Sequence, residues 1–449
     1  MNKKGGKQLI FILWLKKAGE DIGKWLPIAN LLKSSSHALE EIYLDASCGI
    51  TLYEILNMCQ NIRIVKCSTP LYPFKLLDTR QDEFYLYSTT LTHLHITTKG
   101  TRDEDIERIL KGIINLRELM IAEDNPDFLN VLYKHGSRNL SHVCFRPEGL
   151  DKNPPDDEDD VDIDTTQFDR TIDIHHCDNI TADLLLLLLK GQRCTEALSL
   201  TVAPDSSLED WNTVAYFASF HLRYLKFSFT EETEIAFASM IRNCPSLEQI
   251  IIHTVSHPPR LLLHTIQSSL PKLRCFAIEN TPEHAKGNPS AAIDNNELSN
   301  FFQHYESLGN RSPLEEIRLR NLFNVRTSTL LQLTKLEKLR TIHLVGLHYD
   351  FDDPGISPVI RALAAVSLPL LEYLVIDGDD LMDYDIQGLD CTVLKLEYLP
   401  HITETGIEGI TNHSKKLRKL IIRDCEKLDR DVMEDLVAKR KNIKLVYYH

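Results

Sequence analysis

The chain has 449 residues, 43% of them hydrophobic, and a formal net charge of −15 at neutral pH. This composition supports a continuous core and disfavours nucleic acid as the main partner, because phosphate binding needs clustered lysine and arginine. No stretch approaches the roughly 20 apolar residues of a membrane span, and no signal-peptide cleavage site follows the short apolar run Leu9–Leu15. We therefore expect a soluble protein of the cytoplasm, the nucleus or both.

A six-residue phrase, apolar-x-x-apolar-x-apolar, returns about every 25 residues, a spacing typical of leucine-rich repeats. Alternation within each phrase predicts a short strand with one buried face. The repetition predicts an α/β leucine-rich-repeat solenoid (a horseshoe of about 16 repeats), with a parallel sheet on its concave side and mostly helices on its convex side. Clear copies begin at Leu91, Leu116, Leu140, Leu222, Leu247, Leu273, Leu314, Leu339, Leu371 and Leu417, and weaker copies begin near Leu39, Ile62, Asp169, Thr195, Cys391 and Arg440.

Residues 1–38 precede the first copy of the phrase, so the predicted repeat domain spans residues 39–449. The ends of a solenoid expose its core and need a cap. We expect Leu9–Leu15 as a strand and Trp25–Leu32 as a helix to form this cap; the alternative is that residues 1–38 are the remnant of another domain.

Helical patterns follow several of the phrases. The apolar spacing predicts helices at Thr181–Lys190, Glu232–Asn243, Asn296–Ser307 and Arg430–Lys439, the first with Thr181 as its N-cap. The shortened repeat at Asp377–Asp390 is predicted to have no helix.

Two segments interrupt the rhythm of the repeats. Within residues 150–167, the stretch Asp151–Asp164 holds eight acidic residues, one lysine and two adjacent prolines, which predicts a disordered acidic loop. Its alternating aspartates lack the glycine and the final glutamate of a calcium-binding EF-hand loop. Residues 279–312 form an enlarged repeat, in which a loop rich in proline, glycine and asparagine precedes a helix.

The variable half of the repeats carries a recognisable pattern. The stretch Leu417–Leu428 contains Cys425 where the cysteine-containing leucine-rich repeat, L-x-x-L-x-L-x-x-C-x-x-(L/I), has its cysteine. Ile172–Thr181 matches the same stretch with Cys177, Leu399–Ile407 matches the continuation I-T-x-x-G-(L/I), and Asn243–Ile250 matches the (N/K)-C-P-x-L-x-x-L entry to the next strand. In these residues the chain resembles the repeat domain of F-box/leucine-rich-repeat proteins.

That resemblance implies a protein whose repeats select a target for ubiquitination by an SCF-type cullin–RING ligase. The F-box itself is not found: Leu26-Pro27 begins as an F-box does, but the acidic residue that should follow is missing. Two functions therefore stay open. One is a substrate-recognition subunit that meets the SCF components through an F-box supplied elsewhere, and the other is a stand-alone regulator or inhibitor that sequesters its protein partner.

Motifs of catalysis and cofactor binding are missing from the sequence. No phosphate-binding glycine loop, nucleophile elbow, H-E-x-x-H zinc motif or C-x-x-C pair occurs. We expect no enzyme activity, no cofactor and no metal site. His93 and His95 share one strand face, with Glu118 between them and His142, but a metal site needs three or four converging ligands. We interpret these histidines as polar residues of a binding surface, with a pH-sensitive interface as the alternative.

Recognition is predicted to lie on the concave face, where the parallel sheet presents side chains in regular rows. Aromatic residues and arginine are the usual anchors of protein interfaces. Glu316, Asp377 and Glu397 lie among the candidates, which indicates a protein-binding surface of mixed charge. The predicted partner-binding residues are Tyr224, Lys226, Arg318, Arg320, His343, Tyr373, Lys395, Lys419, Arg423, His93, His95 and His142.

Overall fold

The computed structural model describes a chain that divides into two compact units, Met1–Ser206 and Ser207–His449. In the N-terminal unit it describes residues 30, 32–44, 50–67, 87–97, 103–122, 131, 140–146, 171–177 and 196–202. In the C-terminal unit it describes residues 221–231, 233–254, 258–280, 293–366, 368–438 and 443–448. No helix among these residues is long and apolar enough to cross a membrane.

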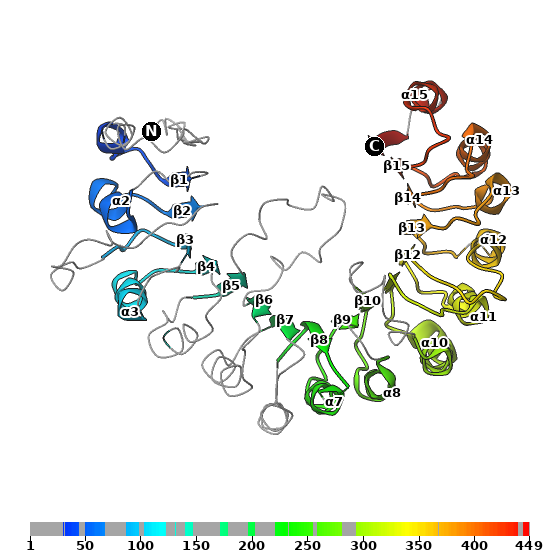
Figure 1. The fold of residues 1–449 in the computed structure, drawn as a ribbon, viewed down its shortest axis with the longest axis horizontal. Coiled ribbons are helices and arrows are strands. Elements are labelled where there is room, and N and C mark those ends of the chain that lie inside the picture. Colours follow the sequence, from blue (N-terminus) through cyan, green and yellow to red (C-terminus); the bar gives the residue numbers. More distant parts are fainter. Residues whose placement is uncertain are drawn as a thin grey trace, which may run out of the picture. The chain divides into compact units, whose positions relative to one another are not determined.

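Parallel strands form the sheet of the N-terminal unit, and each strand pairs with its neighbour in the chain. The helices lie on one face of this sheet (Figure 1). The strands are β1 (Glu41–Leu44), β2 (Ile64–Cys67), β3 (His93–Thr97), β4 (Glu118–Ala122), β5 (His142–Arg146), β6 (Thr171–Cys177) and β7 (Ala197–Val202), and the helices are α2 (Leu52–Met58) and α3 (Asp103–Gly112).

The C-terminal unit repeats the same arrangement, and more of its helices are among the residues that the structure describes (Figure 1). Its strands are again parallel and follow chain order. They are β8 (Tyr224–Phe229), β9 (Gln249–Thr254), β10 (Cys275–Glu279), β11 (Glu316–Arg320), β12 (Thr341–Val345), β13 (Tyr373–Asp377), β14 (Val393–Glu397), β15 (Lys419–Arg423) and β16 (Lys444–Tyr448). The helices are α7 (Glu234–Arg242), α8 (Arg260–Ser269), α10 (Asn295–Leu308), α11 (Thr327–Leu330), α12 (Ser357–Val366), α13 (Asp383–Ile386), α14 (Glu404–His413) and α15 (Arg430–Ala438), with 3₁₀ turns η6 (Gly309–Arg311) and η7 (Leu331–Lys335).

The core lies between the sheet and the helices, as the alternation within each phrase predicts. In β12 the side chains of Ile342 and Leu344 are fully buried towards the helices. Phe301 of α10 is also fully buried and packs on Phe276 of β10, with 4.3 Å between the ring centroids. Parallel strands in chain order, with helices of the described residues on one face of the sheet, make this an α/β leucine-rich-repeat solenoid, so the predicted fold class is confirmed.

The predicted element boundaries agree with the structure except at two places. The predicted helices at residues 232–243, 296–307 and 430–439 correspond to α7, α10 and α15. The repeat at Asp377–Asp390, predicted to lack a helix, instead contains the four-residue helix α13, so that prediction was wrong. The last phrase, predicted near Arg440, lies two residues further along in register, because Leu445 pairs with Leu420, the fourth residue of the preceding phrase.

Several predictions concern residues outside the described ranges. These are the strand Leu9–Leu15, most of the helix Trp25–Leu32, the acidic loop Asp151–Asp164 and the helix Thr181–Lys190. They remain predictions.

The chain turns sharply where strands of the C-terminal unit end. The residue directly after β11, β12, β13, β14 and β15 has a positive φ in each case. Glycine, asparagine and aspartate tolerate this conformation, and they occupy four of the five positions. The residues at these positions are Asn321, Gly346, Gly378, Tyr398 and Asp424. Tyr398 is therefore the unusual member.

Candidate functional site

The concave face is the sheet face turned away from the helices. It carries the third and fifth residues of each phrase and the residue directly after the phrase, which we call the seventh position. In the C-terminal unit, strand register aligns these residues into three rows. The third-position row includes Tyr224, Glu316, Tyr373 and Lys419, the fifth-position row includes Lys226, Arg318, His343 and Lys395, and the seventh-position row includes Glu279, Arg320, Asp377, Glu397 and Arg423. The structure therefore brings the predicted partner-binding residues of this unit onto one face.

Exposure separates these predicted residues into two groups. Tyr224, Arg318, His343 and Lys395 are buried, with 3% to 7% of their surface exposed. Lys226, Arg320, Tyr373, Lys419 and Arg423 are half-buried. Sequence alternation assigned the face but could not assign exposure, because neighbouring side chains on adjacent strands cover the first group.

A buried ion pair stabilises the C-terminal part of this face. The ammonium group of Lys395 lies 3.1 Å from Oε1 of Glu397, and both side chains are at most 5% exposed. Arg423 of β15 approaches the same carboxylate oxygen to 3.7 Å and keeps 24% of its side chain exposed. One buried carboxylate thus balances two cations, and only Arg423 retains substantial contact with solvent.

A second polar cluster surrounds His343 of β12. Arg318 of β11, its register neighbour, forms an ion pair with Glu316. The ring of Tyr373 lies 5.1 Å from the His343 ring, centroid to centroid. Burial, together with the positive charges of Arg318, Arg320 and Lys395, holds the pKa of His343 well below its usual range. His343 is therefore neutral at physiological pH.

Asp377 at the end of β13 has an unusual titration. Burial raises the pKa of Asp377 to about 7, although its Oδ2 accepts a 2.7 Å hydrogen bond from the Gly346 backbone, which acts in the opposite direction. The adjacent carboxylate of Glu397 also raises the pKa. Near neutral pH, Asp377 therefore exists in both its protonated and its ionised form.

Tyr398 is a candidate site residue that was missed in the sequence. It follows β14, has a φ of 50°, and exposes 49% of its surface. The guanidinium carbon of Arg423 lies 6.0 Å from the centre of its ring. Aligning the turns that follow the phrases would have found it, because a bulky aromatic residue occupies a position where the equivalent repeats have glycine, asparagine or aspartate.

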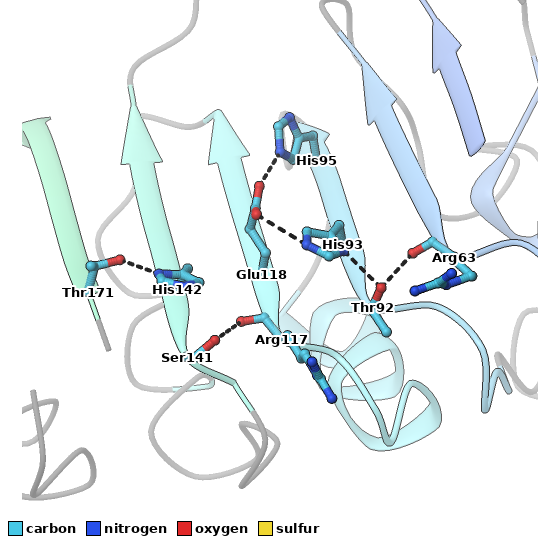
Figure 2. A network of polar contacts seen from close by, with 9 residues as sticks. All are labelled: Arg63, Thr92, His93, His95, Arg117, Glu118, Ser141, His142 and Thr171. Carbon is cyan, nitrogen blue, oxygen red and sulfur yellow. Dashed lines mark hydrogen bonds and ion pairs between the residues drawn. The ribbon is translucent and has the colours of Figure 1, made fainter. Parts of the chain in front are cut away.

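The predicted histidines of the N-terminal unit lie together on the concave face of β3, β4 and β5 (Figure 2). Glu118 of β4 lies between His93 and His142 in register. Its Oε1 lies 2.9 Å from Nε2 of His95, and its Oε2 lies 3.5 Å from Nε2 of His93. The structure thus brings together two imidazoles around one carboxylate, as Figure 2 shows.

Hydrogen bonding fixes the proton on one of the two rings. The hydrogen bond to His95 lowers the pKa of Glu118, so this group is an ionised carboxylate that can only accept, and His95 must donate from Nε2. The hydroxyl of Thr92 lies 3.1 Å from the backbone oxygen of Arg63 and 2.8 Å from Nδ1 of His93, so its one proton serves two acceptors, and these contacts accommodate either tautomer of His93.

His142 makes a separate contact. Its Nδ1 lies 2.8 Å from Oγ1 of Thr171 on β6 (Figure 2). Within the part of the chain that the structure describes, no group of three or more histidine, cysteine, aspartate or glutamate side chains is placed to hold a metal ion. Six cysteines are free thiols; Cys59, Cys244, Cys275, Cys391 and Cys425 are buried, and Cys144 is half-buried.

Comparison with known proteins adds two structural neighbours. No family model matches the sequence, and no curated protein does. A chain in the crystal structure of the yeast Rad7–Elc1 complex is 13% identical, with a TM-score of 0.47 over 95% of this chain and 88% of that chain. An internalin from Listeria monocytogenes is also 13% identical, with a TM-score of 0.38 over 93% of this chain and 88% of that chain. Similarity at this level adds nothing about function.

Proposed function

We propose that this chain is a non-enzymatic scaffold that captures a protein partner on the concave face of its C-terminal unit. The observation that carries the proposal is Tyr398. A bulky residue held at positive φ costs about 1–3 kcal/mol. The Tyr398 side chain meets Asp424 at its hydroxyl and Arg423 over its ring, yet 49% of the residue stays exposed. A contact with a partner explains why tyrosine stands at a turn suited to glycine.

The neighbours of Tyr398 support this proposal. Tyrosine and arginine dominate the energetic centres of protein interfaces, and here the guanidinium carbon of Arg423 lies 6.0 Å from the centre of the Tyr398 ring. The buried carboxylate of Glu397 lies 3.7 Å from Arg423 and restrains it on this face. Tyr373 and Lys419 are half-buried on the same face and extend the surface across β13 and β15.

The resemblance to F-box/leucine-rich-repeat proteins leads to a finer proposal. In this version the captured protein is a substrate, and the chain is a substrate-recognition component in SCF-type ubiquitin-dependent turnover. The second candidate is a regulator that sequesters its partner without a ligase, which the lack of a recognisable F-box in the sequence favours.

Affinity purification of tagged full-length chain, with mass spectrometry of the bound proteins, tests the proposal. The informative variant is Tyr398→Gly, which removes the ring and relieves the backbone. Tyr384→Gly is the matched control, because Tyr384 is also exposed and also lies 6.0 Å from an arginine, Arg361, but on the helical layer.

We expect Tyr398→Gly to lose a bound protein that the wild type and Tyr384→Gly both retain. A set of bound proteins that is unchanged by Tyr398→Gly would refute the concave-face proposal. Co-purification of a cullin and its linker subunit would support the ligase role, whereas a stable complex containing neither would leave the sequestering regulator as the function.

A further inference from the structure

The N-terminal unit carries a second polar surface that the proposed function does not use. We define the histidine cluster as Lys66, His93, His95, Glu118 and His142 on β2 to β5. Its side chains are half-buried, so they reach solvent on the concave face. Figure 2 shows His93, His95 and His142 on both sides of Glu118.

Both oxygens of the Glu118 carboxylate face an imidazole nitrogen. His95 donates to Oε1, and Nε2 of His93 lies 3.5 Å from Oε2. Protonation of His93 would turn the second contact into an ion pair with the same carboxylate. The carboxylate therefore favours uptake of a proton by His93.

We propose that the histidine cluster is a docking surface for an acidic segment of a protein partner, and that it binds this segment more tightly as the pH falls. The proposal rests on the proposed function, namely that the chain binds proteins. It adds the charge of the bound segment and the condition under which that segment binds.

Charge complementarity identifies the acidic partner. The positive charge of Lys66 acts on the carboxylate of Glu118, and the carboxylate of Glu41 accepts a hydrogen bond from Tyr43, the register neighbour of Lys66. Each imidazole of the cluster that binds a proton adds a positive charge near Lys66, which favours the carboxylates of an acidic segment. The remaining register neighbours are Thr171 and Asp173 on β6 and, on β5, Cys144.

The direction of the pH effect follows from linkage. Burial lowers the pKa of His93 more than Glu118 raises it, so His93 is neutral near pH 7. Carboxylates of a bound partner would stabilise the imidazolium forms, so binding takes up protons and its affinity rises as the pH falls. Since imidazole ordinarily titrates near pH 6.5, the change is centred between about pH 7.5 and 5.5.

Fluorescence anisotropy with a fluorescein-labelled deca-glutamate peptide tests the proposal on the full chain at constant ionic strength. We expect binding at pH 5.5 to be about 5- to 150-fold tighter than at pH 7.5, the usual range of coupling between two sites. In the variant His93→Gln/His95→Gln, the affinities at pH 5.5 and pH 7.5 should differ by no more than about twofold. His37→Gln, which removes an exposed histidine of the same unit, should retain the gain.

Two results would overturn the proposal: equal affinity at both pH values in the wild type, or a pH effect that the double variant retains. NMR of the wild-type chain with histidine labelled at carbon ε1 follows the titration of His93 directly and does not depend on a variant. Addition of the peptide should shift the His93 titration to higher pH, and no shift would count against the proposal. The Tyr398→Gly purification tests the proposed function on another unit, so the two can fail separately.

Discussion

The buried charges of β14 give the sharpest prediction about stability. Glu397→Gln keeps the shape of the side chain but leaves Lys395 and Arg423 without their shared carboxylate. Lys395→Met removes one cation and leaves Glu397 paired with Arg423. We expect Glu397→Gln to be the more destabilising change, because it alone leaves a buried charge without a counterion.

The magnitudes follow from the burial of the pair. Both side chains are at most 5% exposed, and removal of one partner from a buried ion pair costs about 3–5 kcal/mol. For Lys395→Met the loss is closer to that of one charged hydrogen bond, about 1.5–3 kcal/mol. The two variants should therefore differ by about 2 kcal/mol, which is about 30-fold in an opening equilibrium.

Native-state hydrogen exchange measured by mass spectrometry on peptides from β14 and β15 gives this opening equilibrium directly. Lys427→Met, at an exposed lysine, is the control and should leave exchange unchanged. The double variant Lys395→Met/Glu397→Leu should exchange more slowly than Glu397→Gln, because apolar replacements of a buried pair are close to neutral. Equal exchange in Glu397→Gln and Lys395→Met would refute this ranking.

Three further predictions test the core and the titrating groups. Phe301→Ala should destabilise the C-terminal unit by about 3–5 kcal/mol, because Phe301 is fully buried against Phe276. Urea unfolding followed by circular dichroism should show this as a lower midpoint. A loss below about 1 kcal/mol would contradict the packing. The pKa of Asp377 is raised to about 7 from an unfolded value near 3.9, so stability should fall as the pH rises from 4 to 7. Asp377→Asn should flatten that slope in the same assay, and an unchanged slope would exclude Asp377 as its source. Glu118→Gln should lower the NMR titration midpoint of His93, because the carboxylate raises the pKa of that ring; an unchanged midpoint would show that the two groups do not interact.

Much of the fold could be predicted from local pattern. The fourth and sixth residues of each phrase became the buried residues of a strand, as Ile342 and Leu344 illustrate. The prediction failed where the local signal was weak. The four residues of α13 are too few to show a helical period.

The candidate site was less predictable than the fold. Strand alternation placed Arg318 and Lys395 on the concave face, but adjacent strands bury them. The prominence of Tyr398 depends on backbone conformation and exposure together, and neither could be read from one repeat. The bridge at Glu118 depends on rotamers that bring two rings from β3 to one side chain on β4.

The sequence by itself determined the repeat, its period and the face to which each strand residue belongs, because alternation in a strand is a property of neighbouring residues. The tertiary structure alone decided which of those residues pair, become buried or keep an ordinary pKa. These properties depend on residues one repeat away, where register brings Arg423 against Glu397, and Glu118 against His93 and His95. Contact between repeats is long-range in the chain, so it forms only when the solenoid stacks.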